Sequence, residues 1–258
     1  FVGIGDEVII PTPTFGMYSF GTEIVGGKVI NVPRDASYDI DVEGIKESVT
    51  DKTKIIFLTS PNNPTGNLVS TEDLAQLLKL DVIVVVDETY YEFCKVTHIN
   101  LLSENANLVI LRTFSKWAGL AGLRIGFGIM DPELVDTIMA MKPPYNVNLA
   151  AEVAIYASLE DRAQLAARVD EIVSERDRVF EVLSNLDNIK LYPSVGNFIL
   201  CEFSDGIGKV IYDSLCNKGI YLRYFGKAPL DDSIRFSIGK PEENEIVINE
   251  ITKIVSGD

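Results

Sequence analysis

The feature that most constrains the fold is a series of short, almost wholly apolar runs in the first half of the chain, the clearest being VIVVV at 82–86. Strand-like runs occupy 6–11, 28–33, 54–60, 81–88, 107–115 and 123–130. Amphipathic patterns typical of helices occupy 16–27, 41–50 and 70–80, the last with a capping-box start. Buried strands that alternate with helices predict a mostly parallel sheet covered on both faces. The functional loops of such a sheet lie at the carboxyl ends of its strands.

The pattern changes in the second half of the chain. Residues 131–149 predict a helix broken by Pro143 and Pro144, and a long helical stretch follows at about 149–187. Further strand-like runs occupy 196–203, 219–225 and 232–239, with helical patterns at 206–218 and 241–255. We therefore expect an α/β fold in two parts. A large three-layer α/β/α domain spans 1–148, and a smaller α+β domain spans 149–258.

Charge and composition exclude several classes of function. The net charge of −15 argues against nucleic acid or an anionic membrane as a partner, since both favour a basic surface. The apolar runs are too short to cross a bilayer. Three distant cysteines (Cys94, Cys201 and Cys216) are typical of a reducing cytoplasm, not of a disulfide framework. The single histidine, His98, excludes a multi-histidine metal site and argues against a Ser-His-Asp triad.

Polar residues gather where two of the predicted strands end. The segment TSPNNPTGN at 59–67 places the amides of Asn62 and Asn63 on a turn constrained by proline and glycine, although a plain surface turn would look the same. Asp87 ends the most apolar strand. A carboxylate there is costly unless it meets a cation, and the alternative role is a helix N-cap.

A third cluster lies in LRTFSKWAGLAGLRIGFG at 111–128, where Lys116 stands among small and apolar residues. Thr113 and Ser115 supply hydroxyls beside it, and Arg124 is expected to begin the next strand. A buried lysine loses affinity for its proton and becomes a nucleophilic amine. Together with an acid for a pyridinium nitrogen and hydroxyls for a phosphate, such a lysine indicates pyridoxal-phosphate (PLP) chemistry.

The motifs PNNPTG, DETYYEF, RTFSK and GLRIG stand in an order and at a spacing that resemble fold-type I PLP-dependent aminotransferases. PTFGMY (13–18), PPYNVN (143–148), GNFIL (196–200), LRYF (222–225) and IRFSIG (234–239) are most similar to the histidinol-phosphate aminotransferase branch. The resemblance covers essentially the whole chain. Each motif alone is weak, but the ordered set is specific.

The resemblance implies roles for individual residues around the cofactor ring. Lys116 matches the lysine that forms a Schiff base with PLP and then moves a proton, and Asp87 matches the acid that keeps the pyridine nitrogen protonated. Asn63 and Tyr90 match the residues that hydrogen-bond the phenolic oxygen. Phe15 matches the aromatic that stacks on the ring, although a simple core residue is the alternative. Lys116, Asp87 and Tyr90 are the implied catalytic residues.

Two further groups are implied to bind anions. Thr113, Ser115 and Arg124 match the side chains that hold the cofactor phosphate. Arg223 and Arg235 match the pair that binds the anionic end of the substrate, and a surface salt bridge is the alternative role for Arg223. No metal is implied.

The resemblance also implies an activity and partners. We expect transamination of L-histidinol phosphate with 2-oxoglutarate in histidine biosynthesis, by a cytoplasmic homodimer that acts on small molecules. Aminotransferases of aromatic or other amino acids, and lyases like threonine-phosphate decarboxylase, share the layout and remain alternatives. The family also carries a segment ahead of Phe1, with a glycine-rich phosphate-binding turn and a tyrosine that reaches the partner subunit. A truncated, catalytically incomplete fragment is therefore the third alternative.

Overall fold

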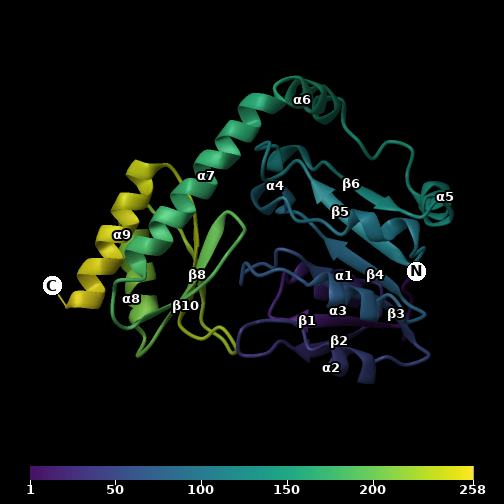
Figure 1. Cartoon of the computed structure of the whole chain (residues 1–258), viewed down its shortest axis with the longest axis horizontal. Coiled ribbons are helices and arrows are strands. Elements are labelled where there is room, and N and C mark those ends of the chain that lie inside the picture. The colour runs from purple at the N-terminus through teal and green to yellow at the C-terminus, as the bar shows by residue number, and fades with distance from the viewer. Residues whose placement is uncertain (258) are drawn as a thin grey trace.

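The computed structural model describes residues 1–257 and contains two β-sheets (Figure 1). The first has the strand order β2-β1-β3-β4-β5-β6 and the second the order β7-β8-β10-β9. The strands of the first sheet are β1 (Glu7–Thr12), β2 (Lys28–Pro33), β3 (Thr53–Thr59), β4 (Ile83–Asp87), β5 (Leu108–Thr113) and β6 (Gly126–Met130). Those of the second sheet are β7 (Ile189–Tyr192), β8 (Phe198–Phe203), β9 (Arg223–Phe225) and β10 (Ser233–Ser237).

Helices lie on both faces of the first sheet. One face packs α2 (Val42–Glu47) and α3 (Thr71–Leu77) through a buried cluster that includes Ile45, Leu74 and Ile56. The other face packs α1 (Met17–Ile24), whose buried Tyr18 contacts the β1 side chains. Strands β1 to β5 pair in parallel and β6 pairs antiparallel with β5. The predicted α/β class, with a mostly parallel sheet between helices, is confirmed.

The second sheet is antiparallel and packs against three longer helices. The remaining helices are α4 (Tyr91–Cys94), α5 (Pro132–Met141), α6 (Leu149–Glu160), α7 (Arg162–Leu183), α8 (Ile207–Asn217) and α9 (Pro241–Ser256). Side chains of α7, α8 and α9 form one buried cluster with β8 and β10, in which Phe236 is 1% exposed. Two short 3₁₀ helices occupy Ile99–Ser103 and Ala121–Leu123.

Three sequence-based expectations were wrong in detail. The strand expected at 123–130 begins only at Gly126, because Arg124 adopts a left-handed conformation with φ of 57° after a 3₁₀ turn. The helical stretch expected at 149–187 is divided by Asp161, which ends α6. Strand β7 was not predicted, because its short run NIKLY directly follows the helix and has little periodicity of its own.

The antiparallel direction of β6 decides what lies at the functional edge of the sheet. The carboxyl ends of β1, β3, β4 and β5 point to one edge, and β6 begins there because it runs the opposite way. The residues that precede β6 therefore join the residues that follow the other strands. Arg124 reaches the same edge as Lys116 for this reason.

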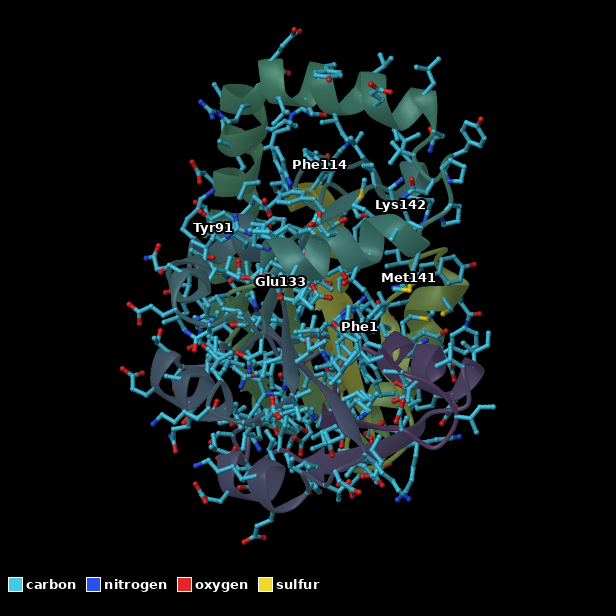
Figure 2. All side chains as sticks on the ribbon, turned by 90° about the vertical axis from the view of Figure 1, so that its right-hand side faces the viewer. Phe1, Tyr91, Phe114, Glu133, Met141 and Lys142 are labelled. Carbon is cyan, nitrogen blue, oxygen red and sulfur yellow. The ribbon has the colours of Figure 1, made fainter. Side chains whose placement is uncertain are left out.

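Apolar side chains remain exposed on α1, α5 and α6. Exposed examples are Phe20, Ile24, Met141, Leu149 and Tyr156. Figure 2 looks onto α5, with Glu133, Met141 and Lys142 labelled on it and Phe1 nearby in the view. Among residues 1–257 no helix combines the length and the apolar character needed to cross a membrane.

The two sheets meet at the turn that carries Asn62 and Asn63. The backbone N–H of Val195 donates to the carbonyl of Gly66 at 3.0 Å, and the rings of Tyr38 and Tyr192 pack with their centroids 4.8 Å apart. Gly66 has φ of +82°, and a Cβ built on it would lie 2.7 Å from the Cα of Ser194. Only glycine fits this close approach.

We expect Gly66→Ala to destabilise the chain by about 2–4 kcal/mol, because a left-handed backbone and an overpacked contact each cost about 1–2 kcal/mol. Urea denaturation measures the loss. Gly5→Ala is the matched control, since Gly5 has φ of +85° and nothing within 4 Å of its Cβ position. Equal losses in the two variants would show that the Ser194 contact contributes nothing.

Candidate active site

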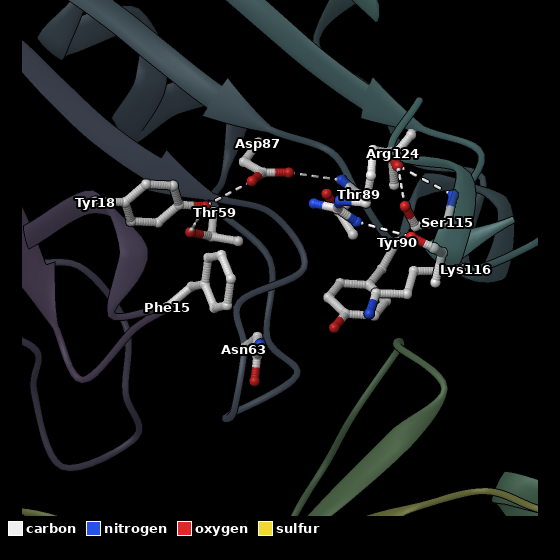
Figure 3. A pocket seen from close by; sticks show the side chains of 12 residues that line it. Phe15, Tyr18, Thr59, Asn63, Asp87, Thr89, Tyr90, Ser115, Lys116 and Arg124 are labelled. Atoms are coloured by element: carbon white, nitrogen blue, oxygen red, sulfur yellow. Dashed lines mark hydrogen bonds between the residues drawn. The ribbon is translucent and has the colours of Figure 1, made fainter. Parts of the chain in front are cut away.

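A pocket of about 250 Å³ lies at the carboxyl edge of the first sheet (Figure 3). All the residues expected to hold the cofactor line it, namely Phe15, Asn63, Asp87, Tyr90, Thr113, Ser115, Lys116 and Arg124. They come from the ends of β1, β3, β4 and β5 and from the turn before β6. The sheet thus brings together side chains that are as far apart in the sequence as Phe15 and Arg124.

Asp87 sits on the floor of the pocket with a donor on each carboxylate oxygen. The hydroxyl of Tyr18 donates to Oδ2 at 2.6 Å and the backbone N–H of Thr89 donates to Oδ1 at 2.9 Å. These two donors hold both oxygens of the carboxylate in place. The alternative role of a helix N-cap is not what the structure shows, because α4 begins at Tyr91 with Tyr90 as its N-cap.

Lys116 approaches the pocket from the turn that follows β5. Its Nζ lies 6.0 Å from the ring centroid of Tyr90. Burial is the largest cause that lowers the pKa of Lys116, and the positive charges of Arg235 and Arg124 lower that pKa further. The amine therefore loses its proton at a lower pH than an ordinary lysine, as a nucleophile requires.

Hydroxyl groups and a guanidinium line the pocket beside Lys116. The hydroxyls of Thr113 and Ser115 lie 2.8 Å apart, and the backbone N–H of Ser115 donates to Thr113 Oγ1 at 3.0 Å. Arg124 is held by a hydrogen bond from its Nη1 to the carbonyl of Ala121 at 2.8 Å. This set of donors has the chemistry of a phosphate site.

Of the two arginines expected to bind substrate, Arg235 reaches the turn at Asn63, and neither Arg235 nor Arg223 lines the pocket itself. Arg235 Nη1 donates to Asn63 Oδ1 at 2.6 Å, while its Nε is buried without a partner. Arg223 pairs directly opposite Arg235 in the antiparallel β9–β10 ladder. Like charges at such a position repel unless an anion lies between them or nearby. No salt bridge involving Arg223 is found among residues 1–257, and its guanidinium lies 5.4 Å from the ring centroid of Phe225.

A buried ion pair stabilises the segment of chain that carries Asp87 and Tyr90. Glu88 is fully buried and accepts a hydrogen bond from Arg112 Nη2 at 2.8 Å and from the backbone N–H of His98 at 2.8 Å. The guanidinium of Arg112 also lies 3.6 Å from the ring centroid of Tyr91. The pair fixes the segment between β4 and α4, on which Asp87 and Tyr90 sit.

Four residues that line the pocket were not predicted from the sequence, namely Tyr18, Thr59, Thr89 and Ala121. Tyr18 was within reach of inference. It stands three positions after Phe15 at the start of α1, and the hydroxyl of a buried tyrosine needs a hydrogen-bond partner. The hydroxyl of Thr59 and the backbone of Thr89 could not be placed without the strand register.

Comparisons with known proteins agree with this geometry. The aminotransferase class I and II family matches residues 1–251. A histidinol-phosphate aminotransferase of Dehalococcoides mccartyi (strain CBDB1) is 48% identical over 245 residues, which is 95% of this chain and 68% of that protein.

Two solved structures are also similar. The histidinol-phosphate aminotransferase from Clostridium acetobutylicum superposes with a TM-score of 0.91 at 26% identity, covering 98% of this chain and 79% of that one. The one from Sinorhizobium meliloti, in complex with pyridoxal-5'-phosphate, gives a TM-score of 0.90 at 25% identity, covering 100% and 72%. With its family match, its fold and its assembled pocket, the chain belongs to the class I and II aminotransferases.

Proposed function

We propose that the pocket binds PLP and that the chain transfers the amino group of L-histidinol phosphate to 2-oxoglutarate, a step of histidine biosynthesis. The observation that carries the proposal is the convergence of Lys116, Asp87 and Arg124 in one pocket, with Arg235 beside it. These groups match the aldehyde, the ring nitrogen and the phosphate of PLP, and the anionic end of a substrate.

The donors and acceptors present fit PLP. The pyridinium nitrogen needs an ionised acceptor, and Asp87 supplies a carboxylate with a donor on each oxygen. The phosphate needs donors, and Thr113, Ser115 and Arg124 supply them on the Lys116 side of the pocket. Phe15 is 45% exposed, so one face of its ring is open to a flat ligand.

When bound, PLP supplies an aldehyde for an amine and a ring that withdraws electrons from the substrate Cα. Around it the chain positions groups and moves protons. Lys116 offers the amine and then carries the proton at the substrate Cα. Asp87 fixes the charge at the ring nitrogen, while Asn63 and Tyr90 orient the phenolic oxygen.

We propose that Arg223 and Arg235 select the substrate. Arg223 and Arg235 together carry two positive charges beside the pocket, and burial lowers the pKa of Arg235, as does the charge of Arg223. A phosphate monoester dianion neutralises both charges, and a carboxylate neutralises one of them. Histidinol phosphate and glutamate carry these groups, one in each half-reaction.

The decisive experiment supplies the purified chain with PLP and one amino donor at a time, and measures glutamate formed from 2-oxoglutarate. We expect turnover of histidinol phosphate at least about tenfold above that of phenylalanine or aspartate, since a phosphate held by arginine is worth more than about 1.4 kcal/mol. Turnover of an aromatic donor alone would contradict the substrate. Release of carbon dioxide from threonine phosphate without an oxo acid would favour the lyase alternative. Failure to bind PLP would favour the incomplete fragment.

The domain boundary, the oligomeric state and the location of the protein are also proposals. We propose that the chain divides into domains near residue 148, where Asn148 caps α6. The exposed apolar residues of α1, α5 and α6 support a homodimer, which sedimentation equilibrium tests. The free thiols of Cys94, Cys201 and Cys216 support a reducing cytoplasm.

A further inference from the structure

Tyr18 contacts Asp87 from the side away from Thr89 (Figure 3). Its ring is packed flat on Phe57, with centroids 4.7 Å apart and an interplanar angle of 10°. It also meets the ring of Phe15 edge-on at 5.8 Å. The phenol is thus held rigidly between the β3 strand and the pocket.

The direction of the hydrogen bonds around Tyr18 is defined. Thr59 Oγ1 donates to the phenol oxygen at 3.3 Å, so the phenol proton is directed to Asp87 Oδ2 at 2.6 Å. Thr59 Oγ1 in turn lies 3.1 Å from Thr14 Oγ1, which donates to the fully buried Asn62. Burial raises the pKa of Tyr18 well above its ordinary value, and so does the charge of Asp87. The phenol therefore remains a donor throughout the working pH range.

We propose that Tyr18 is a positioning residue whose hydroxyl holds the Asp87 carboxylate turned toward the cofactor nitrogen. This inference rests on the proposed function and assigns a role to a residue that acts through Asp87. The hydroxyl of Tyr18, which accepts from Thr59, fixes one oxygen of the carboxylate, and the Thr89 N–H fixes the other. Because Asp87 lines the pocket and both of its oxygens are held, the carboxylate is oriented before PLP arrives.

The direction in which loss of the Tyr18 hydroxyl should shift the titration of the ring nitrogen follows from the proton that this nitrogen shares with Asp87. A ring nitrogen and a carboxylate hold one proton between them, and a donor on the carboxylate favours the ion pair, in which the proton stays on nitrogen. When the Tyr18 hydroxyl is lost, the negative charge on Asp87 is less stabilised and the proton shifts toward oxygen. The ring then withdraws electrons less strongly.

The test compares Tyr18→Phe with the unchanged chain, because phenylalanine keeps the stack on Phe57 and removes one oxygen. Each protein is loaded with PLP that carries ¹⁵N in the ring, and the nitrogen chemical shift is followed against pH. We expect the Tyr18→Phe nitrogen to move toward the unprotonated value at a lower pH than in the unchanged chain. Tyr38→Phe is the matched control, since Tyr38 is 8% exposed and its hydroxyl reaches Pro229 O at 3.5 Å.

A second readout measures PLP affinity from the fluorescence of Trp117, the only tryptophan and the neighbour of Lys116. We expect about tenfold weaker binding in Tyr18→Phe and no change in Tyr38→Phe, since hydrogen bonds to charged groups are among the stronger ones. A Tyr18→Phe nitrogen that titrates like the unchanged chain would overturn the role of Tyr18 while PLP binding upholds the proposed function. An unchanged chain that binds no PLP would overturn both.

Discussion

Lys116→Ala is expected to lower the rate of amino transfer about 10⁴-fold, because both the nucleophilic amine and the proton carrier are lost. The unchanged chain should form an adduct with PLP that borohydride reduces and that remains on Lys116 after proteolysis. The variant should form none, although it should retain the fold, because the Lys116 side chain is exposed and makes no hydrogen bond among the described residues.

Lys79→Ala is the control for Lys116→Ala. Lys79 is exposed on the turn that follows α3, and its loss should change neither the adduct nor the rate. An adduct in Lys116→Ala, located on another lysine, would show that the amine has been assigned to the wrong residue. Rescue of Lys116→Ala by a small primary amine would support proton transfer at this position.

Asp87→Asn is expected to slow the reaction about 10³-fold, since loss of one member of a partly buried ion pair costs about 3–5 kcal/mol. The amide keeps the shape of the side chain but cannot balance the charge on the ring nitrogen. The donors from Tyr18 and Thr89 then point at a neutral group, and one of them faces an amide N–H₂. Single-turnover kinetics with saturating PLP separate this loss from weaker cofactor binding.

Asp81→Asn makes the same chemical change at the opposite edge of the sheet. Asp81 is exposed just before β4, whereas Asp87 ends that strand. We expect the control to retain full activity. If Asp87→Asn retained activity to within about tenfold, the ring charge would be set by another group and the Asp87 assignment would fail.

Most residues of the pocket could be predicted from the sequence, because they follow apolar runs that clearly indicate buried strands. Asp87 and Lys116 each come directly after a run that only a buried strand explains, so the edge of the sheet assembles them wherever the register falls. The turn at Arg124 was less predictable. Its left-handed backbone depends on the packing of GLAGL, which has no regular period.

The second sheet was harder to predict for a related reason. Short antiparallel strands such as β7 owe their pairing to neighbours distant in sequence, and local pattern identifies them poorly, although the predicted run at 219–225 does contain β9. The Arg223–Arg235 pair across β9 and β10 could therefore be expected only from resemblance, whereas the register places the two directly opposite. Such cross-strand neighbours can be identified only once the register of the paired strands is known.

The polarity of the first sheet also has a practical consequence for protein engineering. Strand β6 runs antiparallel to β5, so the turns at its two ends lie at opposite edges of the sheet. The turn before β6 contributes to the pocket, and the turn after Met130 lies at the far edge. Peptide tags or fluorophores inserted at Asp131, or at the exposed Asp51 turn before β3, would sit a full strand length from Lys116. Insertions at those turns should leave catalysis intact, and they offer attachment points for immobilising the enzyme with its pocket facing outward.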